Sequence, residues 1–172
     1  MLIYLQVIDD PKERSRFEEL YRTYRRLMFH VAREILGNDQ DAEDAVQEAF
    51  LSIAKNFEKI STEERHKTKA FVVIVVRNKA INLLSQRKRH ITAESFDETS
   101  DITTELLKDD GVAQCMMKLP VRYRDFLGLK YVWGYDNREL AAFLGISEAG
   151  VRKLNQRAKS ALEKLCREEG LL

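Results

Sequence analysis

Between Phe17 and Ile35, apolar side chains recur at every third or fourth position. The members of this series are Phe17, Leu20, Tyr21, Tyr24, Leu27, Met28, Val31, Ala32 and Ile35. Such spacing places them on one face of an α-helix. Gly37 and Asn38 follow, and glycine at this point is typical of a helix that stops in the left-handed conformation. The chain has only seven glycines and two prolines in 172 residues, which argues against a turn-rich sheet fold, so we predict an all-α protein.

A second helix is predicted to begin at residues 39–41, where acidic side chains favour the positive end of the helix dipole. Its inward positions are apolar: Ala42, Ala45, Val46, Ala49, Phe50, Ile53 and Phe57. Its other face carries Asp41, Asp44, Gln47 and Glu48. The polar residues 58–68 that follow predict a loop.

The next segment contains the β-branched run FVVIVV at residues 71–76, which by propensity suits a buried strand. No turn or partner strand follows this run, and residues 77–89 continue with polar helix formers. We therefore predict one helix over Ala70–Arg89, about 20 residues and roughly 30 Å long.

Charge is segregated along the chain. Residues 1–90 contain 17 Lys and Arg against 14 Asp and Glu, residues 91–110 contain 1 against 7, and residues 111–172 contain 11 against 7. The acidic, weakly apolar middle predicts a flexible linker over 91–110 between two helical domains, 1–90 and 111–172. In the second domain we expect helices at 112–118, 122–131, 137–144 and 147–167, with a break at Leu119-Pro120.

Several classes of function find no support in the sequence. No apolar run reaches the 18 residues of a membrane span, and the start of the chain lacks a basic signal region, so we expect a cytoplasmic protein. Cys115 and Cys166 lie far apart in sequence and predict two packed thiols. The three histidines are isolated, and no nucleophile motif or phosphate loop occurs, so neither an enzyme nor a bound cofactor or metal is predicted. Acidic residues at 41, 43, 44 and 48 favour a helix-start surface over a metal site.

Residues 137–156 have the pattern of a helix-turn-helix. Ala141 stands where the helices would cross, and Gly145 stands at the turn. Apolar residues that would lock the helices together are Leu140, Leu144, Ile146, Val151 and Leu154. Ser147 is expected to cap the second helix. The outward face would then carry Glu148, Ala149, Arg152, Lys153 and Gln156. Arg suits guanine, Gln adenine and Lys phosphate, so DNA binding is favoured over a plain helical hairpin with a basic surface.

A second polar stripe follows the end of the predicted third helix at spacings of four, three and four: Asn78, Asn82, Ser85 and Arg89. Basic residues surround it: Arg77, Lys79, Arg87 and Lys88. Amides and a hydroxyl suit base edges, and cations suit phosphates. By itself the stripe is a weak indication of DNA binding, because a polar stripe is usually just the solvent-facing side of a helix.

Three stretches together resemble the bacterial RNA polymerase sigma factors of the extracytoplasmic-function (ECF) type, in the sigma-70 family. DAEDAVQEAFLSIAKN, Asp41–Asn56, is similar to the segment that docks on the clamp helices of the largest polymerase subunit. AFVVIVVRNKAINLLSQRKR, Ala70–Arg89, is similar to the helix that opens and reads the minus-ten element. The stretch from Leu119 to Leu165 resembles the region that reads the minus-thirty-five element.

The resemblance implies a transcription initiation factor that binds core polymerase, through the clamp helices and the flap of the second-largest subunit, and promoter DNA. It implies docking by Asp41, Asp44, Gln47, Glu48 and Leu51. It implies minus-ten contacts from Arg77, Asn78, Asn82, Ser85 and Arg89, with residues 58–68 forming a pocket for a flipped base. It implies minus-thirty-five contacts from Ser147, Glu148, Ala149, Arg152, Lys153 and Gln156. Family members commonly bind an inhibitory anti-sigma protein.

The chain departs from the family pattern at four places. Phe71 replaces a usual Trp, Asn82 a frequent Asp and Gly150 a usual Thr, while Leu154-Asn155 replaces a basic-then-apolar pair. The alternative is a helix-turn-helix regulator that never enters polymerase and uses its N-terminal domain for dimerisation or sensing. A plain dimer face has no need of a carboxylate stripe beside its apolar seam, so residues 41–56 favour the sigma factor.

Overall fold

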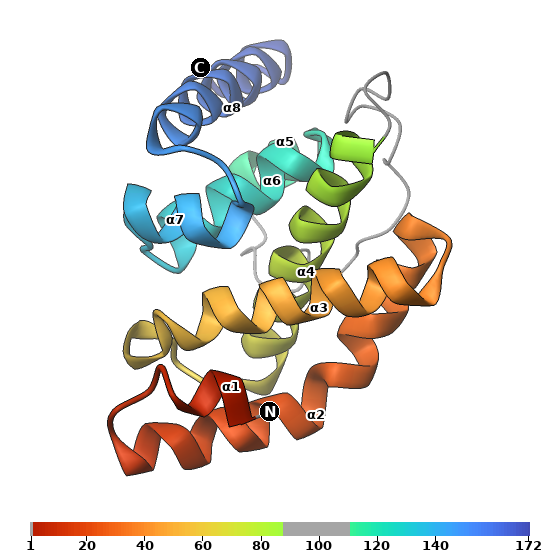
Figure 1. The fold of residues 1–172 in the computed structure, drawn as a ribbon. Coiled ribbons are helices and arrows are strands. Elements are labelled where there is room, and N and C mark those ends of the chain that lie inside the picture. The colour runs from red at the N-terminus through yellow and green to blue at the C-terminus, as the bar shows by residue number, and fades with distance from the viewer. Residues whose placement is uncertain (1, 88–110) are drawn as a thin grey trace. The chain divides into compact units, whose positions relative to one another are not determined.

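The computed structural model describes residues 2–87 and 111–172, and every regular element within these ranges is helical (Figure 1). The first range contains α1 (Leu2–Leu5), α2 (Pro11–Leu36), α3 (Asp39–Ala54), a 3₁₀ turn (Phe57–Lys59) and α4 (Arg65–Arg87). The second contains α5 (Gly111–Lys118), α6 (Val121–Leu127), a π-helical turn (Gly128–Val132), α7 (Asn137–Leu144) and α8 (Glu148–Glu168). The predicted all-α fold is confirmed for the described residues.

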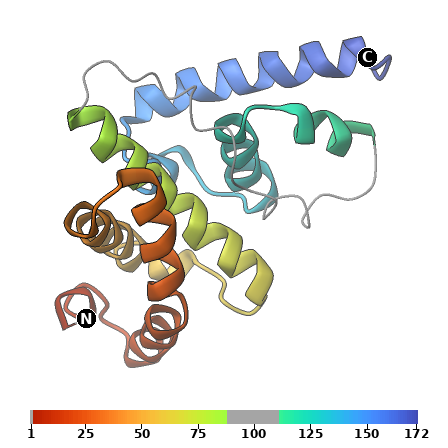
Figure 2. The ribbon, with the colours of Figure 1, turned by 90° about the vertical axis from the view of Figure 1, so that its right-hand side faces the viewer.

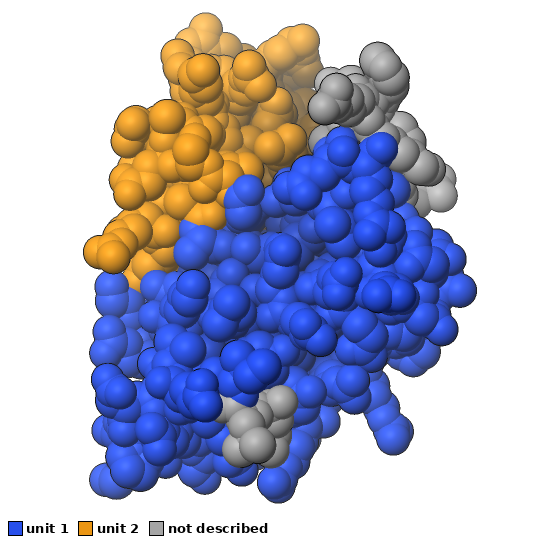
Figure 3. Space-filling model, viewed as in Figure 1, with its two compact units in different colours: residues 1–93, 142–145 blue, residues 94–141, 146–172 orange. Residues whose placement is uncertain are grey.

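The chain divides into two compact units (Figure 3). The first comprises residues 1–93 together with 142–145, and the second comprises 94–141 together with 146–172. The segment 91–110, where the sequence predicts a flexible acidic linker, lies outside the described residues.

The first unit is built from α2, α3 and α4, each packed against the other two (Figures 1 and 2). Aromatic rings fill its centre: the Phe17 ring meets the Phe57 ring edge-on with 5.3 Å between centroids, and the Tyr21 and Phe50 centroids lie 4.7 Å apart. Aromatic pairs at such separations add to the free energy gained from burial alone. All seven apolar positions that the sequence assigned to the inner side of α3 and the following turn are buried.

The run at residues 71–76 is helical, as predicted, and is buried all the way round α4. A helix that is apolar on every side requires neighbours on every side. This accounts for the strand-like composition of the segment, because β-branched residues suit a position that is packed from all directions.

The junction of α2 and α3 is a single tight turn. Gly37 adopts the left-handed conformation with φ of 78°, and its N–H donates to the carbonyl of Arg33 at 2.9 Å. The Asn38 side chain then accepts from the N–H of Asp41 at 2.9 Å and caps α3. Both the helix stop and the helix start expected at residues 37–41 are therefore confirmed.

Three boundaries differ from the sequence prediction. Residues 65–68, expected in a loop, are the first turn of α4, where both the N–H and the hydroxyl of Thr68 donate to the Glu64 carbonyl. The helix expected at 122–131 is α-helical only to Leu127 and then continues as a π-helical turn. The short helix α1 was not predicted; it carries Tyr4, which is buried in the first unit.

In the second unit, α5 and α6 lie along α8 (Figure 2). The buried side of α8 consists of Val151, Leu154, Ala158 and Cys166. Cys166 and Cys115 are both free and buried, as the sequence predicted. Burial and the neighbouring Cys166 thiol raise the pKa of Cys115, which keeps it protonated at neutral pH.

Two glycines predict opposite effects of the same substitution. Gly37→Ala places a Cβ in the left-handed conformation and should lower the free energy of unfolding by about 1 kcal/mol. Gly150→Ala lies inside α8, where a Cβ would meet only ordinary contacts of 3.4 Å or more, and should raise it by about 1 kcal/mol. Urea unfolding followed by circular dichroism measures both changes. Effects of the same sign would contradict the assigned backbone conformations.

Candidate functional surfaces

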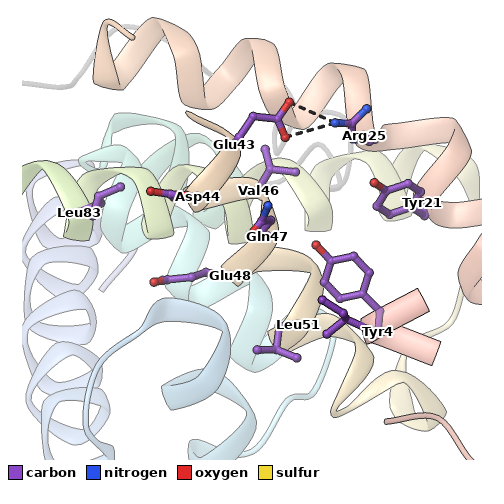
Figure 4. Close-up of a pocket in the computed structure, with 11 residues that line it drawn as sticks. Tyr4, Tyr21, Arg25, Glu43, Asp44, Val46, Gln47, Glu48, Leu51 and Leu83 are labelled. Atoms are coloured by element: carbon purple, nitrogen blue, oxygen red, sulfur yellow. Dashed lines mark hydrogen bonds and ion pairs between the residues drawn. The ribbon is translucent and has the colours of Figure 1, made fainter. Parts of the chain in front are cut away.

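A cleft of about 440 Å³ opens in the first unit beside α3 (Figure 4). Its walls come from α1, α2, α3 and Leu83 of α4. The aromatic side chains of Tyr4 and Tyr21 line one part of it, with Leu51 nearby, and Asp44 and Glu48 project from α3 at another. The cleft therefore combines apolar surface with carboxylates on one helix face.

Four of the five predicted docking residues line this cleft. Asp44, Gln47 and Glu48 are exposed, and Leu51 is half-buried. Within the described ranges neither Asp44 nor Glu48 forms a salt bridge, whereas the neighbouring Glu43 is paired with Arg25 at 3.1 Å. Asp44 and Glu48 therefore remain available to a basic partner.

The prediction that Asp41 belongs to the same outward face is wrong. Asp41 is only 3% exposed, because the Arg87 guanidinium reaches across from α4 and pairs with its carboxylate. The amide of Asn38 also donates to that carboxylate at 2.8 Å. Asp41 thus ties the start of α3 to the end of α4, and its surroundings are those of a stabilising residue rather than a docking one.

Sequence reasoning missed the contribution of the N-terminal segment to the cleft. Ile3 is 71% exposed and lines the cleft, while the neighbouring Tyr4 turns inward. Burial, followed by the nearby Tyr21, raises the pKa of the Tyr4 hydroxyl, so it stays neutral. The signal in the sequence for this contribution is the apolar character of residues 1–8, which include Ile3 and Tyr4.

The polar stripe of α4 is only partly accessible. Asn78 is half-buried and its amide donates to the Ile74 carbonyl at 2.8 Å. The Asn82 amide donates to the Leu144 carbonyl at 2.7 Å, within the first unit as defined above. Ser85 is exposed, and Arg89 lies outside the described residues.

Two cations expected to surround this stripe on the surface are buried instead. Arg77 is 5% exposed, and Lys79 donates to the Ala142 carbonyl at 2.8 Å, also within the first unit. Burial lowers the pKa of Lys79, and the nearby Glu48 carboxylate partly opposes that effect. This burial corrects the prediction that Arg77 and Lys79 stand around the stripe as cations for phosphates.

The predicted turn and cap of the helix-turn-helix are confirmed. Gly145 has a φ of 63°, and the Ser147 hydroxyl accepts from the Gly150 N–H at 3.0 Å, capping α8. Four of the five apolar lock residues are buried, and Ile146 is half-exposed. The predicted outward residues are all exposed: Glu148, Ala149, Arg152, Lys153 and Gln156.

Charge on α8 differs between its two halves. Residues 149–162 contain four cations and no acid: Arg152, Lys153, Arg157 and Lys159. In the part of the chain that the structure describes, none of these four forms a salt bridge. In the last turns, Arg167 pairs with Glu163 at 2.6 Å and Lys164 with Glu168 at 3.9 Å. The first half of α8 therefore presents uncompensated positive charge suited to phosphates.

Metal-binding clusters and membrane-spanning helices are absent from the described ranges. No group of three or more His, Cys, Asp or Glu side chains there is arranged to hold a metal ion. No helix there has the length and apolarity needed to cross a bilayer.

Two sequence families match this chain in the expected order. The family described as Sigma-70 region 2 matches residues 20–90, and Sigma-70, region 4 matches residues 110–162, which together account for most of the chain. The chain belongs to the ECF group of the sigma-70 family. As a sigma factor it serves transcription initiation, and its partners are core RNA polymerase and promoter DNA.

Relatives agree with this assignment. The sigma factor is 27% identical to the ECF RNA polymerase sigma factor SigM of Mycobacterium tuberculosis, over 89% of this chain and 78% of the relative. It is 24% identical to SigW of Bacillus subtilis, over 91% of each chain. Among solved structures, it is similar to the sigma factor RpoE from Bartonella quintana, crystallised with the anti-sigma factor NepR. That match has a TM-score of 0.38 and 17% identity, and covers 88% of this chain and 96% of the other.

The different surroundings of two acidic residues on α3 predict different effects on stability. Asp41→Ala removes the acceptor of both Asn38 and Arg87 and should lower the free energy of unfolding by about 1–3 kcal/mol. Asp44→Ala, a matched change at an exposed position, should alter it by no more than about 0.5 kcal/mol. Urea unfolding of the two variants makes the comparison. Equal, small changes in the free energy of unfolding would contradict the buried position of Asp41 and favour an exposed one.

Proposed function

We propose that this sigma factor divides its work between two domains, 1–90 and 111–172, connected by residues 91–110. The first docks on core polymerase and opens and reads the minus-ten element, and the second reads the minus-thirty-five element. RNA synthesis stays with polymerase, so the sigma factor itself is not an enzyme. It acts in the cytoplasm, where the polymerase is.

The cleft beside α3 supports the docking part of this proposal. Asp44, Gln47 and Glu48 stand exposed next to the apolar surface of Leu51 and Ile3. A partner helix that combines apolar side chains with Lys or Arg would bury the first against the cleft and pair the second with Asp44 and Glu48. The clamp helices of the largest polymerase subunit are the proposed partner. The flap of the second-largest subunit is the proposed partner of the second domain.

The uncompensated cations of α8 carry the promoter-binding part. Arg152 and Lys153 lie one turn into a capped helix that follows a tight turn, and both are exposed. A helix in this setting fits the major groove, where Arg suits a guanine and Lys a flanking phosphate. Ser147, Glu148, Ala149 and Gln156 complete the proposed minus-thirty-five surface.

The minus-ten surface is proposed along α4, from Asn78, Asn82, Ser85 and Arg89, beside residues 58–68. The Asn78 amide donates to one backbone carbonyl, that of Ile74, whereas the Asn82 amide donates to two, those of Leu144 and Gly145. Asn78 therefore keeps a second N–H and its side-chain carbonyl oxygen, and Asn82 keeps its side-chain carbonyl oxygen, for the edge of an unpaired base. An anti-sigma protein that covers these surfaces would silence the factor.

Docking should depend on the two exposed carboxylates of the cleft. Asp44→Lys with Glu48→Lys sets like charges against a basic partner and should weaken binding to core polymerase by at least about tenfold. Run-off transcription should fall in parallel. Glu19→Lys with Glu34→Lys makes the same change in net charge at exposed positions of α2 that do not line the cleft, and should bind normally. Equal binding by both double variants would contradict the proposed surface.

Arg152 and Lys153 should affect promoter binding in different ways. In a holoenzyme of the full chain with core polymerase, Arg152→Ala should cost about 1–3 kcal/mol and relax preference at one minus-thirty-five position. Lys153→Ala should weaken all sequences alike and lower the salt slope by about one. A library of promoter duplexes measured across a salt series reports both quantities.

Two cations of the last turns of α8 serve as matched controls. Arg167 and Lys164 are also on α8 but already paired with carboxylates. Arg167→Ala and Lys164→Ala should leave the affinity and the salt slope unchanged. If the Arg152 and Lys153 variants also kept the parental affinity, base preference and salt slope, this face of α8 would not contact DNA.

A further inference from the structure

Tyr131 is an aromatic side chain held on the surface of the second unit. It is 52% exposed and lies in the π-helical turn that follows α6. Its hydroxyl donates to the carbonyl oxygen of the Asn155 side chain at 2.9 Å. π-helical turns are uncommon and often occur at functional sites, so the position of this side chain calls for a functional explanation.

Two ammonium groups lie close to the Tyr131 ring. The Lys159 Nζ lies 5.1 Å from the ring centroid and the Lys130 Nζ lies 5.9 Å from it. Lys130 also donates to the side-chain oxygen of Asn137 at 2.7 Å, which fixes it from a second direction. Cation–π attraction at such distances holds the ring in place and concentrates positive charge beside α8.

The bond from Tyr131 determines which group Asn155 can offer. The Asn155 side-chain oxygen accepts from the tyrosine, so the free part of the amide is its NH₂ group, which only donates. Positions three and four apart share a helix face, so Asn155 lies in one row with Arg152 and Lys159. The row thus presents a cation, an oriented amide donor and a second cation. Acceptors on DNA, either base edges or phosphate oxygens, match this arrangement.

We propose that Asn155 donates a hydrogen bond to promoter DNA and that Tyr131 is a positioning residue that holds its amide for that contact. The inference rests on the proposed function of α8 and adds to its DNA surface one residue, Asn155, that the proposed minus-thirty-five surface does not contain. It also gives a role to the Leu154-Asn155 pair, which departs from the family pattern. Leu154 is buried in the unit, and Asn155 faces the tyrosine.

The test uses the full chain in a holoenzyme with core polymerase on duplex promoters randomised across the minus-thirty-five element. Asn155→Ala should reduce affinity about three- to tenfold, the range of a single hydrogen bond. Tyr131→Phe keeps the ring near both cations and removes only the hydroxyl, and should cause a smaller loss. In the double variant Tyr131→Phe should add nothing, because its effect acts through Asn155.

The pattern of the loss identifies the acceptor. A base contact would change the preference at one promoter position, whereas a phosphate contact would weaken every sequence alike, and either supports the proposal. The salt slope should stay unchanged in both cases, because no charge is removed. Urea unfolding midpoints measured on the same variants separate positioning from stability. If Tyr131 positions the Asn155 amide, the effects of the two substitutions on DNA affinity should remain non-additive in variants whose unfolding midpoints equal that of the parent.

Three outcomes would overturn the inference. Parental affinity of Asn155→Ala, with Arg152→Ala still weakened, would leave α8 as a DNA helix but remove Asn155 from it. Additive losses from Tyr131→Phe and Asn155→Ala would mean that the tyrosine does not act through the amide. Parental affinity of Arg152→Ala, Lys153→Ala and Asn155→Ala together would overturn the proposed function of α8 and this inference with it.

Discussion

Burial of α4 on all its sides is the constraint on which the first unit depends. Residues 70–76 are apolar all round the helix, so the segment is stable only where other elements surround it. Burying each large apolar side chain contributes about 1.5–3 kcal/mol relative to leaving it in water. Helices α2 and α3 cover much of α4, and each does so by packing its own apolar face against it. The polar faces of these helices are thereby directed outward.

The outward face of α3 follows from this packing. Since α3 buries Ala42, Ala45, Ala49 and Phe50 against its neighbours, the positions between them must face away. Asp44, Gln47 and Glu48 occupy those positions, and the aromatic residues of α1 and α2 add apolar surface beside them. The same helix therefore holds the core together on one side and offers a charged, partly apolar cleft on the other. Such a combination suits a protein partner better than a small ligand.

In the second unit, the distribution of charge along α8 is the constraint. Lys164 and Arg167 add little repulsion between cations, because each has a carboxylate neighbour. The stretch 149–162 instead holds four cations and no acid, so they repel one another until an anion neutralises them. Cation–π contacts with Tyr131 relieve this only for Lys159. Uncompensated charge next to a capped helix start is what a DNA-binding helix requires and what a purely structural helix avoids.

The sequence by itself determined the long helices, the stop at Gly37, the cap at Ser147 and the outward face of α8, because these depend on residues a few positions apart. Gly37 and Ser147 are examples: each acts on a backbone group within four residues. Only the tertiary structure decided which exposed-looking positions are covered. Asp41 has the helical spacing of Asp44 and Glu48, yet Arg87, 46 residues away, covers it. The link between Tyr131 and Asn155 likewise joins residues 24 positions apart. Periodicity tells which way a side chain points from its own helix, whereas the element that meets it there depends on how distant parts of the chain pack.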